Sequence, residues 1–233
     1  YGLKSFFYGT LLKEPPLVAQ SAPEAIRRIL NEGHEIGIHG YNHAYWAGKF
    51  GEFNAVDIRT EFFKAMEKYE EIIGSRPISS ACPNWRCTEE ILEEADKFNF
   101  LYLSDVRGVT PFFPKTNKGV LNTPQIPQTM PVFHECLQAG ICSKKDAVEY
   151  LVENELKEGK LNVFTLHDWS EGLLYPEIAD NFIASAKDRG YIFKTLSNCA
   201  KEILENRAAI PSCGFALKAV QGSIGKIAFQ EVD

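Results

Sequence analysis

Two histidines four positions apart, His39 and His43, are the residues of this chain best placed to hold a metal ion. They follow an alternating run, Glu35 to Ile38, that is typical of a short buried strand, and Gly40 then permits a turn. In an extended backbone the two imidazoles would lie about 13 Å apart, too far for one ion. A bend that begins at Gly40 would bring both rings onto one face, where each nitrogen can reach about 2.0–2.1 Å from a Zn²⁺-like metal.

The metal hypothesis lacks a third ligand in this part of the sequence. A histidine pair with this spacing also occurs by chance, so a carboxylate or another histidine is needed to support it. None of the acids before His39 lies at a clear strand end; they are Glu14, Glu24, Glu32 and Glu35.

Alternation of helices and short strands predicts an α/β chain with a parallel sheet and crossover helices. Helices are expected at residues 21–33, 57–73, 88–98, 143–158, 178–189 and 198–205. Strands are expected at residues 35–39, 78–81, 100–103, 161–166 and 192–193, and a loop-rich region at 108–131.

Polar side chains follow several of these strands, at the end where α/β enzymes gather ligands. His39, Arg86, Asp105 and His167 all come just after an apolar run. Each alone has a structural explanation: a histidine bonded to a core carbonyl, a turn-capping aspartate or a salt-bridging arginine. Together, a metal site, a proton-donating histidine, an aspartate to orient it and an arginine form a hydrolytic set.

Composition sets broad limits on the function. With 233 residues, 45% of them hydrophobic, residues 1–233 are expected to form a single domain. The net charge of −6 argues against nucleic-acid binding, and the six cysteines form no Cys-x-x-Cys pair. Without a secretory leader or an apolar run of spanning length, a cytoplasmic location is expected.

Four motifs in order resemble the polysaccharide deacetylase (NodB-homology) family: Gly-Ile-His-Gly-Tyr-Asn-His, Pro-Asn-Trp-Arg, Ser-Asp-Val-Arg-Gly and Thr-Leu-His. The chain is most similar to the formamidoarabinose deformylase branch, on His43-Ala-Tyr-Trp, Thr123-Pro-Gln-Ile-Pro and the Glu171-Gly pair. The similarity covers residues 33–200. It implies a distorted (β/α) barrel of about seven parallel strands, lacking its first strand in this chain, with residues 211–233 as a C-terminal extension.

The resemblance also implies roles for the polar residues. His39 and His43 would be two ligands of a divalent metal, with zinc preferred and cobalt, nickel or manganese as alternatives. His167 would be the general acid, Asp105 would orient it and tune its charge, and Arg86 would pair with the catalytic base of the family.

The implied reaction is metal-dependent hydrolysis of the formyl or acetyl amide of an amino sugar. Leu166 would line the acyl pocket, with Trp85 nearby, and Glu171 would bind substrate. The branch implies a formamidoarabinose linked to polyprenyl phosphate, met at the inner membrane face during lipid A modification. Formyl and acetyl differ by one methyl group, worth about 1–3 kcal/mol in an apolar pocket, so a general polysaccharide or oligosaccharide N-deacetylase remains an alternative.

One family feature is missing from the sequence. The acidic turn that follows the first strand, which supplies the catalytic base and the third metal ligand, does not precede His39. It either lies upstream of Tyr1, or this copy has lost it and is a catalytically silent sugar-binding module. The tail at 214–229 could cover the barrel bottom, pack on a partner subunit or touch a membrane, and the oligomeric state stays open.

Overall fold

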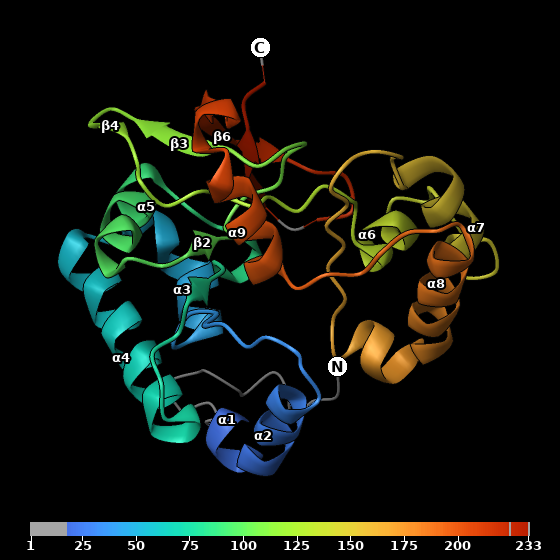
Figure 1. Cartoon of the computed structure of the whole chain (residues 1–233), viewed down its shortest axis with the longest axis horizontal. Helices are drawn as coiled ribbons and strands as arrows, with labels where there is room; N and C mark the ends of the chain where they lie inside the picture. The colour runs from blue at the N-terminus through green and yellow to red at the C-terminus, as the bar shows by residue number, and fades with distance from the viewer. Residues whose placement is uncertain (1–17, 224, 233) are drawn as a thin grey trace.

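Helices surround a set of short parallel segments (Figure 1). This computed structural model describes residues 18–223 and 225–232, so the first strand expected before Tyr1 lies outside the described residues. The α-helices are α1 (Val18–Ser21), α2 (Pro23–Asn31), α3 (His43–Lys49), α4 (Ala55–Ile73), α5 (Glu89–Ala95), α6 (Phe133–Gln138), α7 (Ala147–Tyr150), α8 (Pro176–Asp188) and α9 (Leu196–Glu205). The short helical turns are η2 (Phe50–Glu52), η3 (Pro83–Trp85), η4 (Asp96–Phe98), η5 (Leu151–Glu155), η6 (Ser170–Leu174) and η7 (Arg207–Ala209). The strands are β1 (Ser79–Ser80), β2 (Tyr102–Leu103), β3 (Phe113–Thr116), β4 (Gly119–Val120), β5 (Ser212–Cys213), β6 (Phe215–Ala219) and β7 (Lys226–Gln230).

Short parallel segments pair side by side and form a sheet-like layer through the middle of the molecule, which we call the wall. Ile38 pairs with β1, β1 with β2, and the end of β2 with Gln125, all in parallel. Beyond Gln125, the N–H groups of Thr129 and Met130 both donate to the carbonyl of Val163 at 3.1 Å, which brings the next segment alongside. Because parallel neighbours end at a common edge, the residues that follow Ile38, β1 and β2 lie close to one another. The predicted parallel α/β arrangement is confirmed.

The helices flank this wall on two sides. In Figure 1, α4 and α5 lie on one side of the molecule and α7 and α8 on the other, with β2 between them. Fully buried apolar side chains of the largest core cluster, among them Ile58, Ile91 and Leu103, pack α4 and α5 against the wall. No helix within residues 18–223 is long and apolar enough to cross a bilayer.

Local signals at its ends explain why α4 forms. Asn54 accepts from the backbone N–H of Asp57, and the Asp57 carboxylate accepts in return from the N–H of Asn54, which makes a capping box. At the other end Gly74 adopts the left-handed conformation, with φ of 82°. The helix predicted at 57–73 is therefore confirmed, with a start two residues earlier at Ala55.

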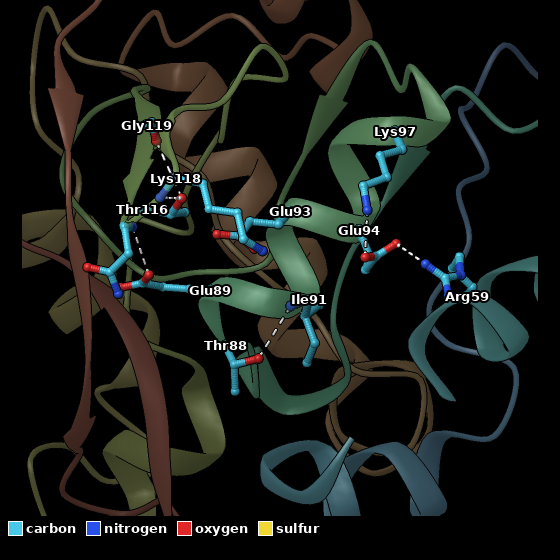
Figure 2. A network of polar contacts seen from close by, with 11 residues as sticks. Arg59, Thr88, Glu89, Ile91, Glu93, Glu94, Lys97, Thr116, Lys118 and Gly119 are labelled. Carbon is cyan, nitrogen blue, oxygen red and sulfur yellow. Dashed lines mark hydrogen bonds and ion pairs between the residues drawn. The ribbon is translucent and has the colours of Figure 1, made fainter. Parts of the chain in front are cut away.

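A network of ion pairs holds the outer face of α5 (Figure 2). The buried Glu94 pairs with Arg59 of α4 at 3.2 Å and with Lys97 at 2.6 Å. Glu93 pairs with Lys118, between β3 and β4. These contacts fix α5 both to α4 and to the β3–β4 hairpin, which forms inside the region predicted to be loop.

The predicted strands form less completely than the predicted helices. Residues 35–39 contribute one bridge at Ile38, and the segments 161–166 and 192–193 contain no strand. In the segment 161–166 the N–H of Val163 donates to the side-chain oxygen of Thr129 at 2.8 Å. A side-chain hydroxyl therefore takes the place of the backbone carbonyl that would accept this hydrogen bond in a β-strand. The segment 192–193 was predicted wrongly, since Ile192 is 83% exposed and has no sheet beside it.

The tail forms a β-hairpin at the carboxyl edge of the wall. β6 and β7 pair antiparallel, and Arg107 exchanges backbone hydrogen bonds with Ala228 and Gln230. An ideal Cβ placed on Gly225 would lie 2.9 Å from the guanidinium of Arg86. The hairpin therefore packs against residues of the predicted site.

We predict that Gly37→Ala destabilises the fold by about 1–3 kcal/mol. A Cβ on Gly37 would lie 2.6 Å from the Ser79 hydroxyl and 3.1 Å from the Ser79 carbonyl, so the wall would have to separate beside Ile38. The measurement is urea unfolding. The control is Gly48→Ala in α3, where a Cβ meets no atom within 4 Å and the free energy of unfolding should stay equal or rise. Equal stability of the Gly37 variant and the parent would contradict the close approach.

Candidate active site

His39 and His43 lie together at the carboxyl edge of the wall. Gly40 turns the chain between them with φ of 70°, and an ideal Cβ there would lie 3.0 Å from Pro83, so glycine is required. His43 then begins α3, whose N-cap residue Asn42 accepts from Tyr45 N–H at 3.0 Å. The two ring centroids are 5.2 Å apart with planes tilted by 53°. The bend predicted at Gly40 is confirmed.

The donor chemistry of this pair fits a metal ion. His39 Nδ1 lies 2.8 Å from the carbonyl of Ala81, which favours the tautomer with hydrogen on Nδ1 and leaves the Nε2 lone pair available. Burial, and then the neighbouring His43, lower the pKa of His39 to about 4, although the residue as a whole is exposed to solvent. Burial, His167 and Arg86 lower the pKa of His43 in the same direction. Both imidazoles are therefore neutral near pH 7, which is the form that binds metals.

His167 lies in an aromatic and polar cluster. Its ring packs edge-on against His134, with centroids 4.9 Å apart, and against Trp169 at 6.0 Å. Its backbone N–H donates to Glu171 Oε2 at 2.8 Å. The charge of His167 lowers the pKa of both His39 and His43, so all three imidazoles face one region of the edge.

Arg86 and Trp85 reach this region on η3, the turn after β1. Asn84 and Trp85 adopt left-handed conformations with φ of 54° and 51°, which are uncommon for residues other than glycine. The turn is held because the indole N–H of the buried Trp46 donates to the Arg86 carbonyl at 3.0 Å. The Arg86 guanidinium donates to the carbonyl of Ala47, so α3 and η3 support each other.

Asp105 is placed differently from the role that the resemblance implies. Its Oδ1 accepts from the Cys82 N–H at 2.7 Å and its Oδ2 from the Gln125 amide at 2.9 Å. Burial raises the pKa of this carboxyl. Neither oxygen bonds to His167, so the expected direct orientation of the acid by Asp105 is absent from the described contacts.

A buried group formed by Cys82, Cys87 and Asp105 has donor atoms within 4.8 Å of one another. Burial raises the pKa of both thiols, and both oxygens of Asp105 already accept hydrogen bonds. The three residues therefore act as packing beneath η3. Among residues 18–223 and 225–232 no group of three potential ligands includes His39 and His43, so their third ligand is not found there.

A buried ion pair lies beside His167 and was missed by the sequence analysis. Arg107 donates to both oxygens of Glu135 at 2.7 and 2.9 Å, and its guanidinium stacks over Trp85 at 4.2 Å. Glu135 follows His134 in α6, so the pair connects η3 to the ring that touches His167. Its members come from segments far apart in sequence, and the only available signal was the Arg107 in the Ser-Asp-Val-Arg-Gly motif.

The residues predicted to bind substrate lie at different places on this edge. Glu171 is buried beside His167, and Trp85 packs on Arg107. Leu166 is 41% exposed, one residue before His167. An acyl pocket shared by Leu166 and Trp85 stays a prediction.

The geometry defines an α/β protein with a histidine-rich site at the carboxyl edge of a parallel wall, and comparison with known proteins agrees. The model of the polysaccharide deacetylase family matches residues 2–103. A solved structure, a probable polysaccharide deacetylase of Pseudomonas aeruginosa PAO1, superposes with a TM-score of 0.65 at 21% identity, over 82% of this chain and 65% of that one. The NodB-like barrel fold predicted from the sequence is thereby confirmed.

Two curated relatives extend the match over most of the chain. Both carry the name probable 4-deoxy-4-formamido-L-arabinose-phosphoundecaprenol deformylase. The protein of Wigglesworthia glossinidia brevipalpis is 30% identical over 86% of this chain and 69% of its own length. That of Shewanella sediminis is 28% identical over 83% of this chain, which spans 61% of the relative. The chain belongs to the polysaccharide deacetylase family.

We predict that Arg107→Met destabilises the protein by about 3–5 kcal/mol, because it leaves the Glu135 carboxylate buried without its partner. Urea unfolding measures the change. The double variant Arg107→Met with Glu135→Leu removes both charges and should recover most of the loss. Lys49→Met, which removes an exposed ion pair with Glu52, is the control and should unfold like the parent. A single variant as stable as the parent would show that the buried pair is not formed.

Proposed function

We propose that this protein is a metal-dependent amidohydrolase that removes the N-acyl group of an amino sugar. The observation that carries the proposal is the convergence of His39, His43 and His167 at one edge of the wall, where the charge of His167 acts on both His39 and His43. Membership of a deacetylase family supports the same class of reaction.

The metal in this proposal is a divalent ion, with zinc preferred and cobalt, nickel or manganese as alternatives. His39 and His43 would hold it through neutral ring nitrogens, and the Ala81 carbonyl keeps the His39 ring in place. When bound, such an ion polarises the acyl carbonyl and activates water as the nucleophile.

His167 is the proton donor in this proposal. As the C–N bond of the amide breaks, the imidazolium gives its proton to the nitrogen and the amine leaves, while the ring becomes neutral. Arg86 places its positive charge beside His43 and would hold an acidic catalytic base. The packing of His167 against His134 and Trp169 limits rotation of the donor ring.

The proposed substrate is a formamido sugar, because both curated relatives are named as deformylases of formamidoarabinose phosphoundecaprenol. With a polyprenyl carrier the reaction would take place at a membrane surface. A general polysaccharide or oligosaccharide N-deacetylase is the alternative within the same class. Leu166 and Trp85 are the candidates for the acyl pocket, which would separate formyl from acetyl by about 1–3 kcal/mol.

The direct test is release of formate or acetate by the protein after metal removal and reloading. Chelator-treated protein should be inactive, and one of zinc, cobalt, nickel or manganese should restore turnover on formylated or acetylated amino sugars, free or polyprenyl-linked. Formate released faster than acetate supports the deformylase. A protein that binds the sugar but releases neither acid with any of the four metals would be a sugar-binding module, and the proposal would fail.

We further predict that His167→Ala lowers turnover by about 10²–10⁴-fold while the metal content stays unchanged. His43→Ala should instead lower the metal content as well, since it removes a ligand. Metal analysis of both variants beside their turnover separates the two roles. Unchanged turnover of the His167 variant would exclude it as the proton donor.

A further inference from the structure

Glu171 is a buried carboxylate with one oxygen in use. It lies on η6 and is 2% exposed. Its Oε2 accepts from the backbone N–H of His167 at 2.8 Å, whereas its Oε1 is buried with no hydrogen-bond partner among the described residues. A buried carboxylate oxygen without a partner is costly, so this oxygen requires a donor in the working protein.

Potential donors lie in the same cluster. The Nδ1 atoms of His167 and His134 are also buried without a partner in the described part of the chain. The Glu171 charge acts on both rings and raises the pKa of each. The unpaired Oε1 of Glu171 therefore lies in the same cluster as the unpaired Nδ1 atoms of His167 and His134.

The other acids near His167 are already engaged. Glu135 is held by both guanidinium nitrogens of Arg107, and Asp105 is held by Cys82 and Gln125. Asp168 is exposed to solvent, and its Oδ1 accepts from the N–H of Trp169 at 2.8 Å. Of these carboxylates, Glu171 alone combines burial, a hydrogen bond to His167 and an unused oxygen.

We infer that Glu171 is the positioning residue of the proton donor: it anchors the backbone of His167 and uses its second oxygen to hold the imidazole in the protonated form. This assigns to Glu171 the task that the resemblance gives to Asp105, in place of direct binding of the substrate. The inference rests on the proposed function of His167. The proton passes from the imidazolium of His167 to the leaving nitrogen.

Electrostatics supports this role. Burial outweighs the neighbouring carboxylates and lowers the pKa of His167 below its ordinary value, which works against proton donation. Glu171 opposes burial most strongly, followed by Asp168 and Glu135, while Arg107 acts with burial. The charge of His167 in turn lowers the pKa of His39 and His43, so these two rings also lie within its electrostatic range.

The test is the pH dependence of turnover in Glu171→Gln. The amide oxygen of glutamine can still accept from the His167 N–H, so the variant removes the charge and keeps the anchor. A general acid must be protonated, so turnover falls as pH rises through its pKa. Loss of the Glu171 charge should move this alkaline limb to lower pH by about one unit or more. Metal content and urea unfolding should stay close to those of the parent.

Two other variants sharpen the comparison. Glu177→Gln changes an exposed acid at the start of α8 and should leave the limb in place. Asp105→Asn tests the partner implied by the resemblance, and its limb should also stay in place. A limb that moves in the Asp105 variant and not in the Glu171 variant would overturn the inference.

A second readout does not depend on turnover. NMR titration of the His167 ring in metal-free protein should give a lower pKa in Glu171→Gln than in the parent. Equal values would overturn the inference even if the enzyme is active. Failure of the proposed function is distinct, because in that case the parent itself releases neither formate nor acetate with any metal.

Discussion

The parallel pairing of short segments determines where every candidate residue lies. Ile38 beside β1, and β1 beside β2, set a common edge, and Gly37 permits the first contact because it lacks a Cβ where Ser79 approaches. The wall contains few strand residues, so little of its stability comes from ladder hydrogen bonds. The apolar packing of α4 and α5 instead holds it in place.

Beyond this edge, the site is assembled by contacts that join one loop to another. Trp46 holds the carbonyl of Arg86, and Arg107 joins Trp85 to Glu135. The tail adds β7 to the backbone of Arg107. The tail hairpin therefore lies against one side of the candidate site. The left-handed turn at η3 is held by several contacts, as strained loops require.

Local signals in the sequence were enough for the long helices α4 and α8 and for the histidine turn. The end of α4 at Ile73 and the Gly40 bend depend on residues close in sequence, and both were predicted correctly. The strand at 161–166 was not, because a side chain of Thr129 replaced a backbone partner. The Arg107–Glu135 pair and the neighbouring His134 join segments with no common local pattern, so tertiary packing alone brings them together.

In the proposed function, one residue type performs two opposed tasks within this small region. Ligand histidines must be neutral, whereas a proton donor must carry its proton at the working pH. Burial lowers the pKa of His39, His43 and His167 alike, so burial cannot separate the tasks. Neighbouring charges can separate them. Arg86 adds to the lowering of the pKa of His43, whereas Glu171, Asp168 and Glu135 oppose the lowering of the pKa of His167. In that proposal, the different tasks of the three imidazoles follow from which loop places a carboxylate beside a ring.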